Sequence, residues 1–102
     1  MSGYAFGPGV ATDLEGIWEH IAADDLEAAD RMLHAFYAQF DCLAAFPHMG
    51  HARSDLAGSR PVLFWPVGAH LIICRADRQP IQIVAVTHAS RDVPRFLRSR
   101  PA

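Results

Sequence analysis

The segment His88-Ala-Ser-Arg91-Asp92 combines a histidine, an arginine and a carboxylate one residue after a mostly apolar run, Ile81–Val86. Histidine exchanges protons near neutral pH, and the forked guanidinium group of arginine binds carboxylates and phosphates through two parallel hydrogen bonds. If the run is a strand, these side chains lie where the strand leaves its sheet. The segment therefore predicts a cationic surface for carboxylates or phosphates. The alternative is a solvated strand end with a local Arg–Asp pair of little energetic consequence.

Further side chains are expected to extend this surface. Arg75 ends an apolar run, Arg53 follows a Pro/Gly loop, and Arg95 follows Arg91 by four residues. We expect Arg53 and Arg75 near the His88 segment. Trp65 alternates with Phe64 along a predicted strand, so one of the two rings faces outward, and we take Trp65 as the candidate.

The six histidines raise the question of a metal site. His48 and His51 form the only close pair, but they lie in a Pro/Gly loop with only Asp55 nearby, which is an incomplete ligand set. The sequence also has no Gly-rich phosphate loop and no G-x-S-x-G or H-E-x-x-H motif. We therefore predict no metal and no cofactor, and the missing motifs argue against a hydrolase or a nucleotidase.

The elements that must position these residues follow from apolar spacing. Recurrence at three- and four-residue intervals predicts helices over Ala11–Ala22 and Leu26–Phe46, and the short link between them makes an antiparallel hairpin. Alternating or apolar runs bounded by turn residues predict the remaining elements. These are strands over Ser2–Phe6, Arg60–Trp65, Ala69–Arg75 and Ile81–His88.

The expected fold class is α+β, with the order β-α-α-β-β-β in two layers. The last three strands form an antiparallel meander, because links of two to four residues are too short for a parallel crossover. The helical hairpin then packs on a small antiparallel sheet, in which the position of the N-terminal strand is left open. With 102 residues, of which 51% are hydrophobic and 20% charged, the chain is expected to form one globular domain over residues 1–102.

Charge is divided unevenly between the two halves of the chain. Residues 1–47 carry eight acidic side chains and one arginine, a charge of −7, whereas residues 48–102 carry eight arginines and three aspartates, a charge of +5. The net charge of −2 taken alone argues against a polyanionic partner, but the basic second half reopens that question.

Cysteine usage and hydropathy bear on the compartment. Cys42 and Cys74 lie inside apolar patterns and form no C-x-x-C pair, which favours buried free thiols in a reducing cytosol. The N-terminus has no basic segment followed by a long apolar one, and no apolar run reaches the roughly 20 residues of a membrane helix. We expect a cytoplasmic protein with no membrane contact.

From about Ala11 to Leu97 the sequence resembles the RelE/ParE superfamily of bacterial type II toxin–antitoxin modules, on its ParE side. The resemblance is carried by motifs that are individually weak but occur in the family's order. They are Ala11-x-Asp13-Leu14-x-x-Ile17-Trp18-x-x-Ile21-Ala22, Asp25-x-x-Ala28-Ala29-x-Arg31, Leu43-Ala44-x-Phe46-Pro47-x-Met49-Gly50-x-x-Arg53-x-Asp55-Leu56, Pro66-Val67-Gly68-x-x-Leu71-Ile72 with Arg75, and Val86-x-His88-x-x-Arg91-Asp92.

The resemblance implies a growth-inhibiting toxin that is neutralised by a ParD-like antitoxin in a hetero-oligomeric complex. The arginines of the second half are then expected to attract an acidic or amphipathic peptide, and the apolar stripes of the hairpin also allow a helix-in-groove mode. The candidate residues for binding the antitoxin or the target are Arg53, Trp65, His70, Arg75, His88, Arg91, Asp92 and Arg95.

Two branches of the superfamily differ in their targets. RelE-type members are ribosome-dependent endoribonucleases, whereas characterised ParE-type members poison DNA gyrase. The position that often holds a C-terminal tyrosine in the ribonucleases falls at Phe96 or Leu97, neither of which transfers protons, and the chain has no lysine. We favour gyrase as the target, with no sequence-specific binding of nucleic acid.

Two alternatives stay open. A ribonuclease would use His88 and Arg91 as its catalytic residues. A non-toxic binding domain that has decayed from a toxin is the other, because His70 and Cys74 occupy strand positions where tyrosine is common in the family.

Overall fold

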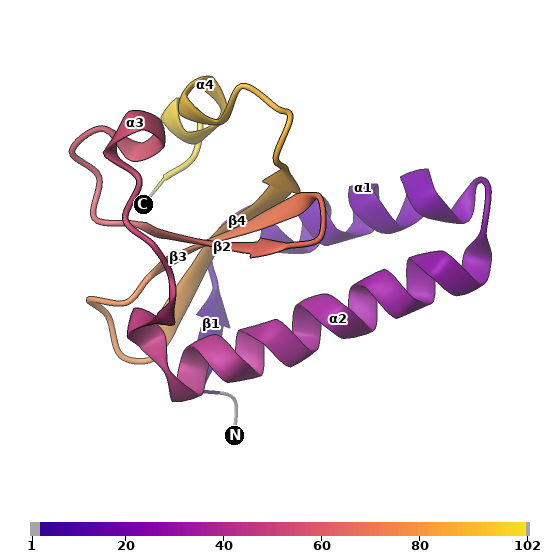
Figure 1. The fold of residues 1–102 in the computed structure, drawn as a ribbon, viewed down its shortest axis with the longest axis horizontal. Coiled ribbons are helices and arrows are strands. Elements are labelled where there is room, and N and C mark those ends of the chain that lie inside the picture. Colours follow the sequence, from indigo (N-terminus) through magenta and orange to yellow (C-terminus); the bar gives the residue numbers. More distant parts are fainter. Residues whose placement is uncertain (1–2, 102) are drawn as a thin grey trace.

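A computed structural model describes residues 3–101 and contains a helical hairpin, a four-stranded sheet and several short helices (Figure 1). In chain order the elements are β1 (Tyr4–Phe6), α1 (Val10–Ala22), α2 (Leu26–Ala45), the short 3₁₀ helix η1 (Pro47–Met49), α3 (Ser54–Ala57), β2 (Leu63–Val67), β3 (His70–Arg75), β4 (Ile81–His88) and α4 (Val93–Arg98). The predicted hairpin and strands are therefore confirmed with small shifts at their ends, while Ser2 lies outside the described residues.

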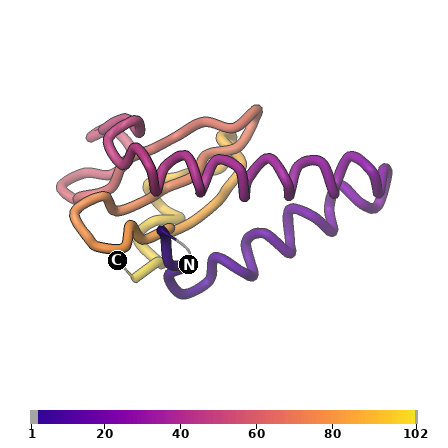
Figure 2. The backbone as a smooth tube through the Cα atoms, turned by 90° about the horizontal axis from the view of Figure 1, so that it is seen from below, coloured from indigo at the N-terminus to yellow at the C-terminus, as the bar shows by residue number. Residues whose placement is uncertain are grey.

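Specific side chains fix the turn of the hairpin. Asp25 is the N-cap of α2, and its carboxylate accepts a hydrogen bond of 3.0 Å from the Ala28 amide. The indole N–H of Trp18 on α1 donates to Asp30 on α2 at 2.9 Å, which ties the two helices together near that turn. The turn projects beyond the strands in both views (Figures 1 and 2).

The strand order in the sheet is β1-β4-β3-β2. Strands β2, β3 and β4 are antiparallel neighbours, as the short links predicted. Strand β1 pairs in parallel with β4, with Tyr4 opposite Ile81, so the sheet as a whole is mixed and not purely antiparallel. The long excursion through the hairpin and two strands gives the chain the crossover that parallel pairing needs.

Hydrophobic cores lie on both faces of the sheet. The hairpin covers one face, where the buried residues are Val10, Leu14, Phe36, Phe40, Leu43, Ile72, Cys74, Ile81, Ile83 and Val86. The short helices α3 and α4, which contact each other, cover the opposite face, where the buried residues are Val62, Phe64, Ile73, Val84, Ala85, Val93 and Leu97. The two central strands are thus buried on both sides, which is why their sequences read as almost unbroken apolar runs.

A β-bulge in β4 sets which face its last residues occupy. Ile73 pairs with Ala85 whereas Cys74 pairs with Ile83, so Val84 is an extra residue in the ladder. Val84 and Ala85 consequently belong to the same core, and Val86 returns to the hairpin side. Without this bulge, strict alternation would turn His88 away from the hairpin.

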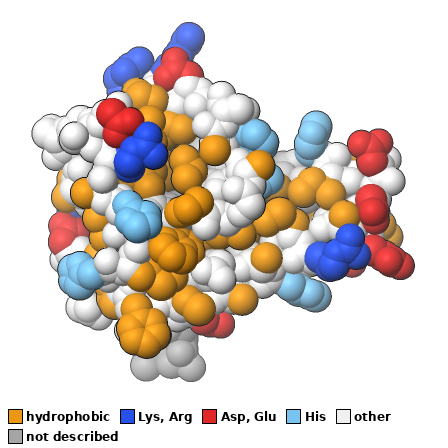
Figure 3. All heavy atoms as spheres, viewed as in Figure 1, with side chains coloured by type: hydrophobic (Ala, Val, Ile, Leu, Met, Phe, Trp, Pro, Cys, Tyr) orange, Lys and Arg blue, Asp and Glu red, His pale blue; other side chains and the backbone are white. Residues whose placement is uncertain are grey.

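Acidic and basic side chains gather in different parts of the folded molecule. The exposed acidic residues Glu19, Asp24, Asp25 and Glu27 surround the projecting turn of the hairpin, where red side chains gather in Figure 3. Most blue side chains in the same view lie at the top and upper left, around the short helices α3 and α4 (Figure 1), and one lies beside the red group on the hairpin. The charge division of the sequence therefore becomes a division between the projecting hairpin and the part of the molecule that holds the sheet.

Candidate functional site

A cleft of about 720 Å³ opens between α1 and the adjoining ends of β3 and β4. Its lining from α1 consists of Thr12, Asp13, Gly16, Ile17, His20 and Ile21, and its lining from the strands and the loop beyond them consists of His70, Val86, Thr87, His88 and Arg91. This volume is typical of a ligand pocket. Three predicted site residues, His70, His88 and Arg91, are thus brought together.

The two strand histidines face each other across the ladder. His70 pairs with His88 in the register of β3 and β4, and their rings meet edge to face with centroids 5.1 Å apart. The His70 ring also packs edge to face on Phe36 at 5.5 Å, and its Nδ1 is buried without a hydrogen-bond partner. Burial, and next the charge of His88, lower the pKa of His70, so this side chain is neutral at neutral pH.

The loop that follows β4 determines which ring nitrogen of neutral His88 carries the proton. The Ser90 amide donates to His88 Nδ1 at 3.0 Å, and the Ser90 hydroxyl lies 2.7 Å from the same nitrogen. Because a backbone N–H only donates, Nδ1 is an acceptor, and the neutral ring carries its proton on Nε2. The lone pair that a general base needs is therefore engaged by Ser90, and the other ring nitrogen is a donor.

Arg91 supplies the cation of the cleft. Its guanidinium lies over the Phe96 ring of α4, with Cζ 4.5 Å from the ring centroid. Among residues 3–101, the carboxylates that form ion pairs are those of Asp13, Asp55 and Asp77, and none of them pairs with Arg91. The guanidinium is thus held in place by an aromatic face while its hydrogen-bond donors stay available.

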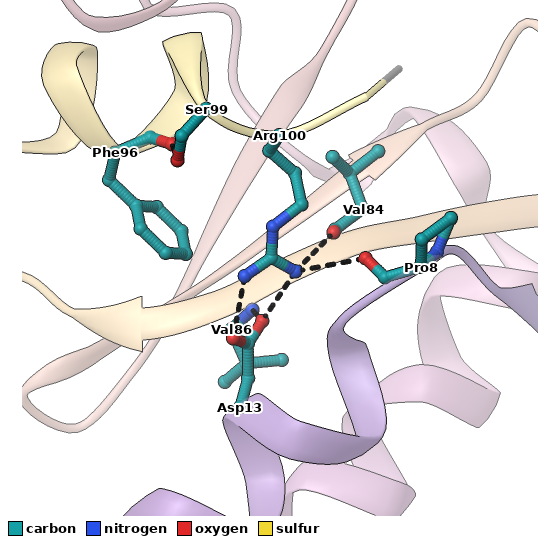
Figure 4. Close-up of polar contacts among 7 residues, drawn as sticks. All are labelled: Pro8, Asp13, Val84, Val86, Phe96, Ser99 and Arg100. Atoms are coloured by element: carbon teal, nitrogen blue, oxygen red, sulfur yellow. Dashed lines mark hydrogen bonds and ion pairs between the residues drawn. The ribbon is translucent and has the colours of Figure 1, made fainter.

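A buried ion pair lies beside the cleft and includes Asp13 from its lining (Figure 4). Arg100, from the segment after α4, contacts both carboxylate oxygens of Asp13 at 2.7 and 3.0 Å, and the two side chains are only 11% and 10% exposed. Arg100 also donates to the carbonyls of Pro8 and Val84, and Asp13 accepts from the Val86 amide at 3.1 Å. We call this group, Asp13 and Arg100 with the three backbone groups, the clasp.

The clasp seals the edge of β4 beyond the end of β1 and depends on two further residues. Gly9, with φ +91°, precedes α1 at a point where a Cβ atom would approach Arg100 Nη1 to 2.6 Å, so glycine is required. Arg60 donates to the carbonyls of Leu97 and Arg100, which holds the segment after α4 against the sheet.

Two predicted residues lie away from the cleft. Arg75 pairs with Gln82 at the opposite end of β3 and β4 from His70 and His88, so the expectation that it lies near His88 is wrong. The reason is the antiparallel pairing, which sets the end of β3 beside the start of β4. Arg75 binds the adjacent Asp77 at 2.7 Å instead, and that hydrogen bond lowers the pKa of Asp77.

Arg53 likewise pairs locally. It precedes α3 and binds Asp55 at 2.8 Å, which lowers the pKa of the Asp55 carboxyl chiefly through their hydrogen bond. It does not line the cleft.

The remaining predicted residues have structural partners. The prediction that Trp65 faces outward is wrong, because both faces of the sheet are covered. Phe64 is buried beneath α3 and α4, and Trp65 is half-buried on the hairpin side, where it donates to Gln39 Oε1 at 2.7 Å and stacks with His51. Asp92 is the N-cap of α4 and accepts from the amide of Arg95, whose own side chain is exposed in the last turn of that helix. The local Arg91–Asp92 ion pair considered from the sequence does not form.

The remaining predictions concern a metal site, a membrane-spanning helix and the two cysteines. Nowhere in residues 3–101 do three or more His, Cys, Asp or Glu side chains come together as a metal site would require. No helix in that part of the chain is both long and apolar enough to cross a membrane. Both cysteines are free, but only Cys74 is buried, which raises its pKa to about 11, and Cys42 is exposed, contrary to prediction.

A second, smaller hollow of about 270 Å³ lies in the groove between the two hairpin helices. It is lined by Ala11, Leu14, Glu15, Trp18, Leu33 and Tyr37. The nearby rings of Phe6 and Tyr37 are exposed. This apolar groove fits the helix-in-groove mode that the hairpin stripes suggested.

Sequence reasoning missed the residues that shape the cleft from outside the strands. The site residues predicted from the sequence include none of His20, Asp13, Arg60 and Arg100. The short helix α4 had a readable signal, because Asp92 followed by Pro94 is typical of a helix start and Val93 and Leu97 share a face. The Asp13–Arg100 pairing, across 87 positions, had none.

The comparisons with known proteins agree with this architecture. Residues 4–93 match the family model described as ParE toxin of type II toxin-antitoxin system, parDE. No curated protein is similar enough in sequence to match. A solved chain described as "Chromosomal ParDE TA system from P. aeruginosa" superposes with a TM-score of 0.71 at 19% sequence identity, covering 86% of this chain and 96% of that chain. At that identity the likeness shows a shared fold.

Proposed function

The chain belongs to the ParE toxin family of type II toxin–antitoxin parDE systems, and from this membership we propose that it inhibits growth by poisoning DNA gyrase and is neutralised by a ParD-like antitoxin. The observation that carries the proposal is the match of residues 4–93 to the family model. Because gyrase acts on chromosomal DNA, we place the protein in the cytoplasm. We treat the whole chain as one toxin domain.

The cleft argues against the ribonuclease alternative. A ribonuclease of the related branch needs a group that takes the proton of the 2′-hydroxyl and another that protonates the leaving oxygen. The lone pair of His88 Nδ1 accepts from Ser90, and Phe96 lies under the guanidinium groups of Arg91 and Arg100. Leu97 is 1% exposed. These positions offer binding and packing but no acid–base pair.

The surface supports a peptide partner. The cleft places His88 and Arg91 beside an apolar floor, and the groove between the hairpin helices adds a second apolar surface. We propose that the antitoxin occupies these surfaces in a hetero-oligomeric complex. The outer residues Arg53, Trp65, Arg75 and Arg95 are then peripheral contacts for the antitoxin or the target, and Asp92 serves by holding α4 beside Arg91.

The test is to induce the chain alone in a bacterial host, and then together with the reading frame adjacent to its gene. We expect growth arrest with gyrase–DNA cleavage complexes in the first case and normal growth in the second. Purified gyrase incubated with the purified chain should likewise accumulate cleaved plasmid. Undisturbed gyrase supercoiling at an excess of the chain would refute the proposal.

The same cultures distinguish the two rivals. A ribosome-dependent ribonuclease would produce cuts at preferred codons in primer-extension maps, and His88→Ala or Arg91→Ala would abolish both the cuts and the growth arrest. A folded chain that is harmless at high expression would indicate a non-toxic binding domain.

A further inference from the structure

We propose that the cleft between α1 and the ends of β3 and β4 binds a large apolar side chain that lies next to a carboxylate on the partner peptide, with Arg91 and His88 holding the carboxylate. This inference rests on the proposed antitoxin partner, and it names the chemistry that the antitoxin segment presents. Nothing in the family match assigns this cleft a ligand.

Hydrogen-bond donors lie together at the cleft. The Arg91 guanidinium is positioned by the Phe96 ring and has no carboxylate partner among the described residues. His88 accepts from Ser90 through Nδ1, so its neutral ring offers an N–H at Nε2. Thr12, Thr87 and His20 add further polar groups to the lining. A set of donors with one fixed cation favours an anion.

The floor of the cleft is apolar. It is formed by Ile17 and Ile21 of α1 and by Val86 of β4, while Gly16 leaves space because nothing beyond its own turn of helix lies within 4 Å of the position its Cβ would take. Burying an apolar group there is worth roughly 25 cal/mol per Å² of surface removed from water. A ligand that uses the whole site therefore needs an apolar body beside its charge.

The clasp makes the site cationic. Asp13 belongs to the cleft wall, and an unpaired carboxylate there would repel an anion. Arg100 binds both of its oxygens and thereby cancels that charge. Arg100 is in this sense a positioning residue: it never has to touch the ligand, yet it keeps the opposing carboxylate occupied.

A peptide fits these observations better than nucleic acid does. Binding to a nucleic-acid backbone relies on several arginines or lysines that neutralise successive phosphates. In this cleft Arg91 is the one arginine in the lining, and the floor is aliphatic. One carboxylate next to an apolar side chain matches one guanidinium next to an apolar floor.

The experiment titrates the purified full chain with phenylacetate, a carboxylate on an apolar ring, and follows the amide signals of Ile17, Ile21 and Val86 by nuclear magnetic resonance. Phenylacetamide is the neutral probe of the same shape, and adenosine monophosphate is the phosphate probe. We expect phenylacetate to bind roughly five- to tenfold more tightly than the amide, since one charge-assisted hydrogen-bonded contact is lost with the charge.

The matched variants are Arg91→Gln and Arg98→Gln, which remove the same charge from two exposed arginines near α4, only one of which lines the cleft. We expect Arg91→Gln to erase the preference for phenylacetate and Arg98→Gln to keep it. Equal binding of acid and amide, or equal effects of the two variants, would overturn the site.

Tighter binding of adenosine monophosphate than of phenylacetate would overturn the assignment to a peptide. None of these readouts involves gyrase or growth, so a failure here is separate from a failure of the proposed function.

Discussion

The clasp and the cleft lie side by side along α1, but their arginines differ in burial and in hydrogen bonding. In the clasp, Arg100 is 11% exposed and its guanidinium is satisfied by one carboxylate and two backbone carbonyls. In the cleft, the exposed Arg91 rests on Phe96 with its donors unused by any carboxylate of residues 3–101. The sequence alone does not distinguish these two arginines, because both belong to the same basic C-terminal part.

This difference distinguishes charged side chains that stabilise the fold from charged side chains that are available for binding. A buried charge whose partners are complete holds the chain together, and removing one partner leaves an uncompensated charge in a medium of low dielectric constant. An exposed charge whose only neighbour is an aromatic face costs little to maintain and stays free to bind. Removing a charge from the clasp should therefore mainly lower the free energy of unfolding, whereas removing the charge of the cleft should mainly weaken ligand binding.

The largest expected effect follows from opening the clasp. Asp13→Ala leaves Arg100 buried with only the carbonyls of Pro8 and Val84, and it removes the acceptor of the Val86 amide. We expect this change to lower the free energy of unfolding by about 3–5 kcal/mol, the range for breaking one side of a buried pair. Urea unfolding followed by circular dichroism measures it.

The control is the double variant Asp13→Ala with Arg100→Met. Removing both charges abolishes the uncompensated guanidinium, so the double variant should lose less stability than the sum of the two single ones, with a coupling of about 1–3 kcal/mol. If Asp13→Ala alone costs less than about 1 kcal/mol, the clasp does not bear the structural role assigned to it.

The clasp also shows where prediction from the sequence must stop. The hairpin and the three-stranded meander were predictable, because periodic apolar spacing and short turns are local signals. The pairing of Asp13 with Arg100 has no periodicity and joins opposite ends of the chain. The misplacement of Arg75 came from a correct strand prediction without the register, since the two ends of β3 lie at opposite ends of the sheet.

The bulge in β4 was hidden for a related reason. The run Ile83-Val84-Ala85-Val86 is apolar at every position, so its sequence carries no alternation from which an extra residue can be read. Yet this bulge decides that Val86 and His88 face the hairpin. The sequence predicts the segment His88 to Asp92 as a place for chemistry, but the direction in which it points had to come from the structure.

An intermediate effect on stability is expected at the pair His70 and His88. It should be smaller than the effect of opening the clasp and larger than that of breaking an exposed ion pair. Burial, and secondarily the charge of His88, lower the pKa of His70 in the folded protein. In the unfolded chain a histidine has its ordinary pKa of about 6.5. As the pH falls below that value, the unfolded state takes up a proton that folded His70 resists, so stability falls with decreasing pH until the folded pKa is reached.

The measurement is the free energy of unfolding between about pH 7.5 and pH 5, above the ordinary range of carboxyl groups. His70→Gln should flatten this acid-side slope, although His20, His88, Asp13 and Arg91 also line the cleft beside it. His34→Gln, at an exposed position on α2, is the matched substitution and should keep the slope. An unchanged slope in His70→Gln would contradict the role of burial at this ring.

The smallest effect on stability is expected at Arg53 and Asp55, which form an Arg–Asp ion pair like that of the clasp but exposed to solvent. Their side chains are 48% and 63% exposed, so solvent screens the attraction, and such pairs add little to stability. The hydrogen bond from Arg53 nevertheless lowers the pKa of Asp55. Arg53→Gln should therefore raise the pKa of Asp55 towards its ordinary value without a measurable change in the urea midpoint.

Both quantities come from one sample, since nuclear magnetic resonance follows the Asp55 carboxyl during a pH titration and circular dichroism follows unfolding. A pKa that moves while stability does not would show that an Arg–Asp pair forms without holding the fold. A clear loss of stability in Arg53→Gln would mean instead that exposure does not separate this pair from the clasp. The contrast between the two pairs would then have to lie in the additional backbone contacts of Arg100 with Pro8 and Val84.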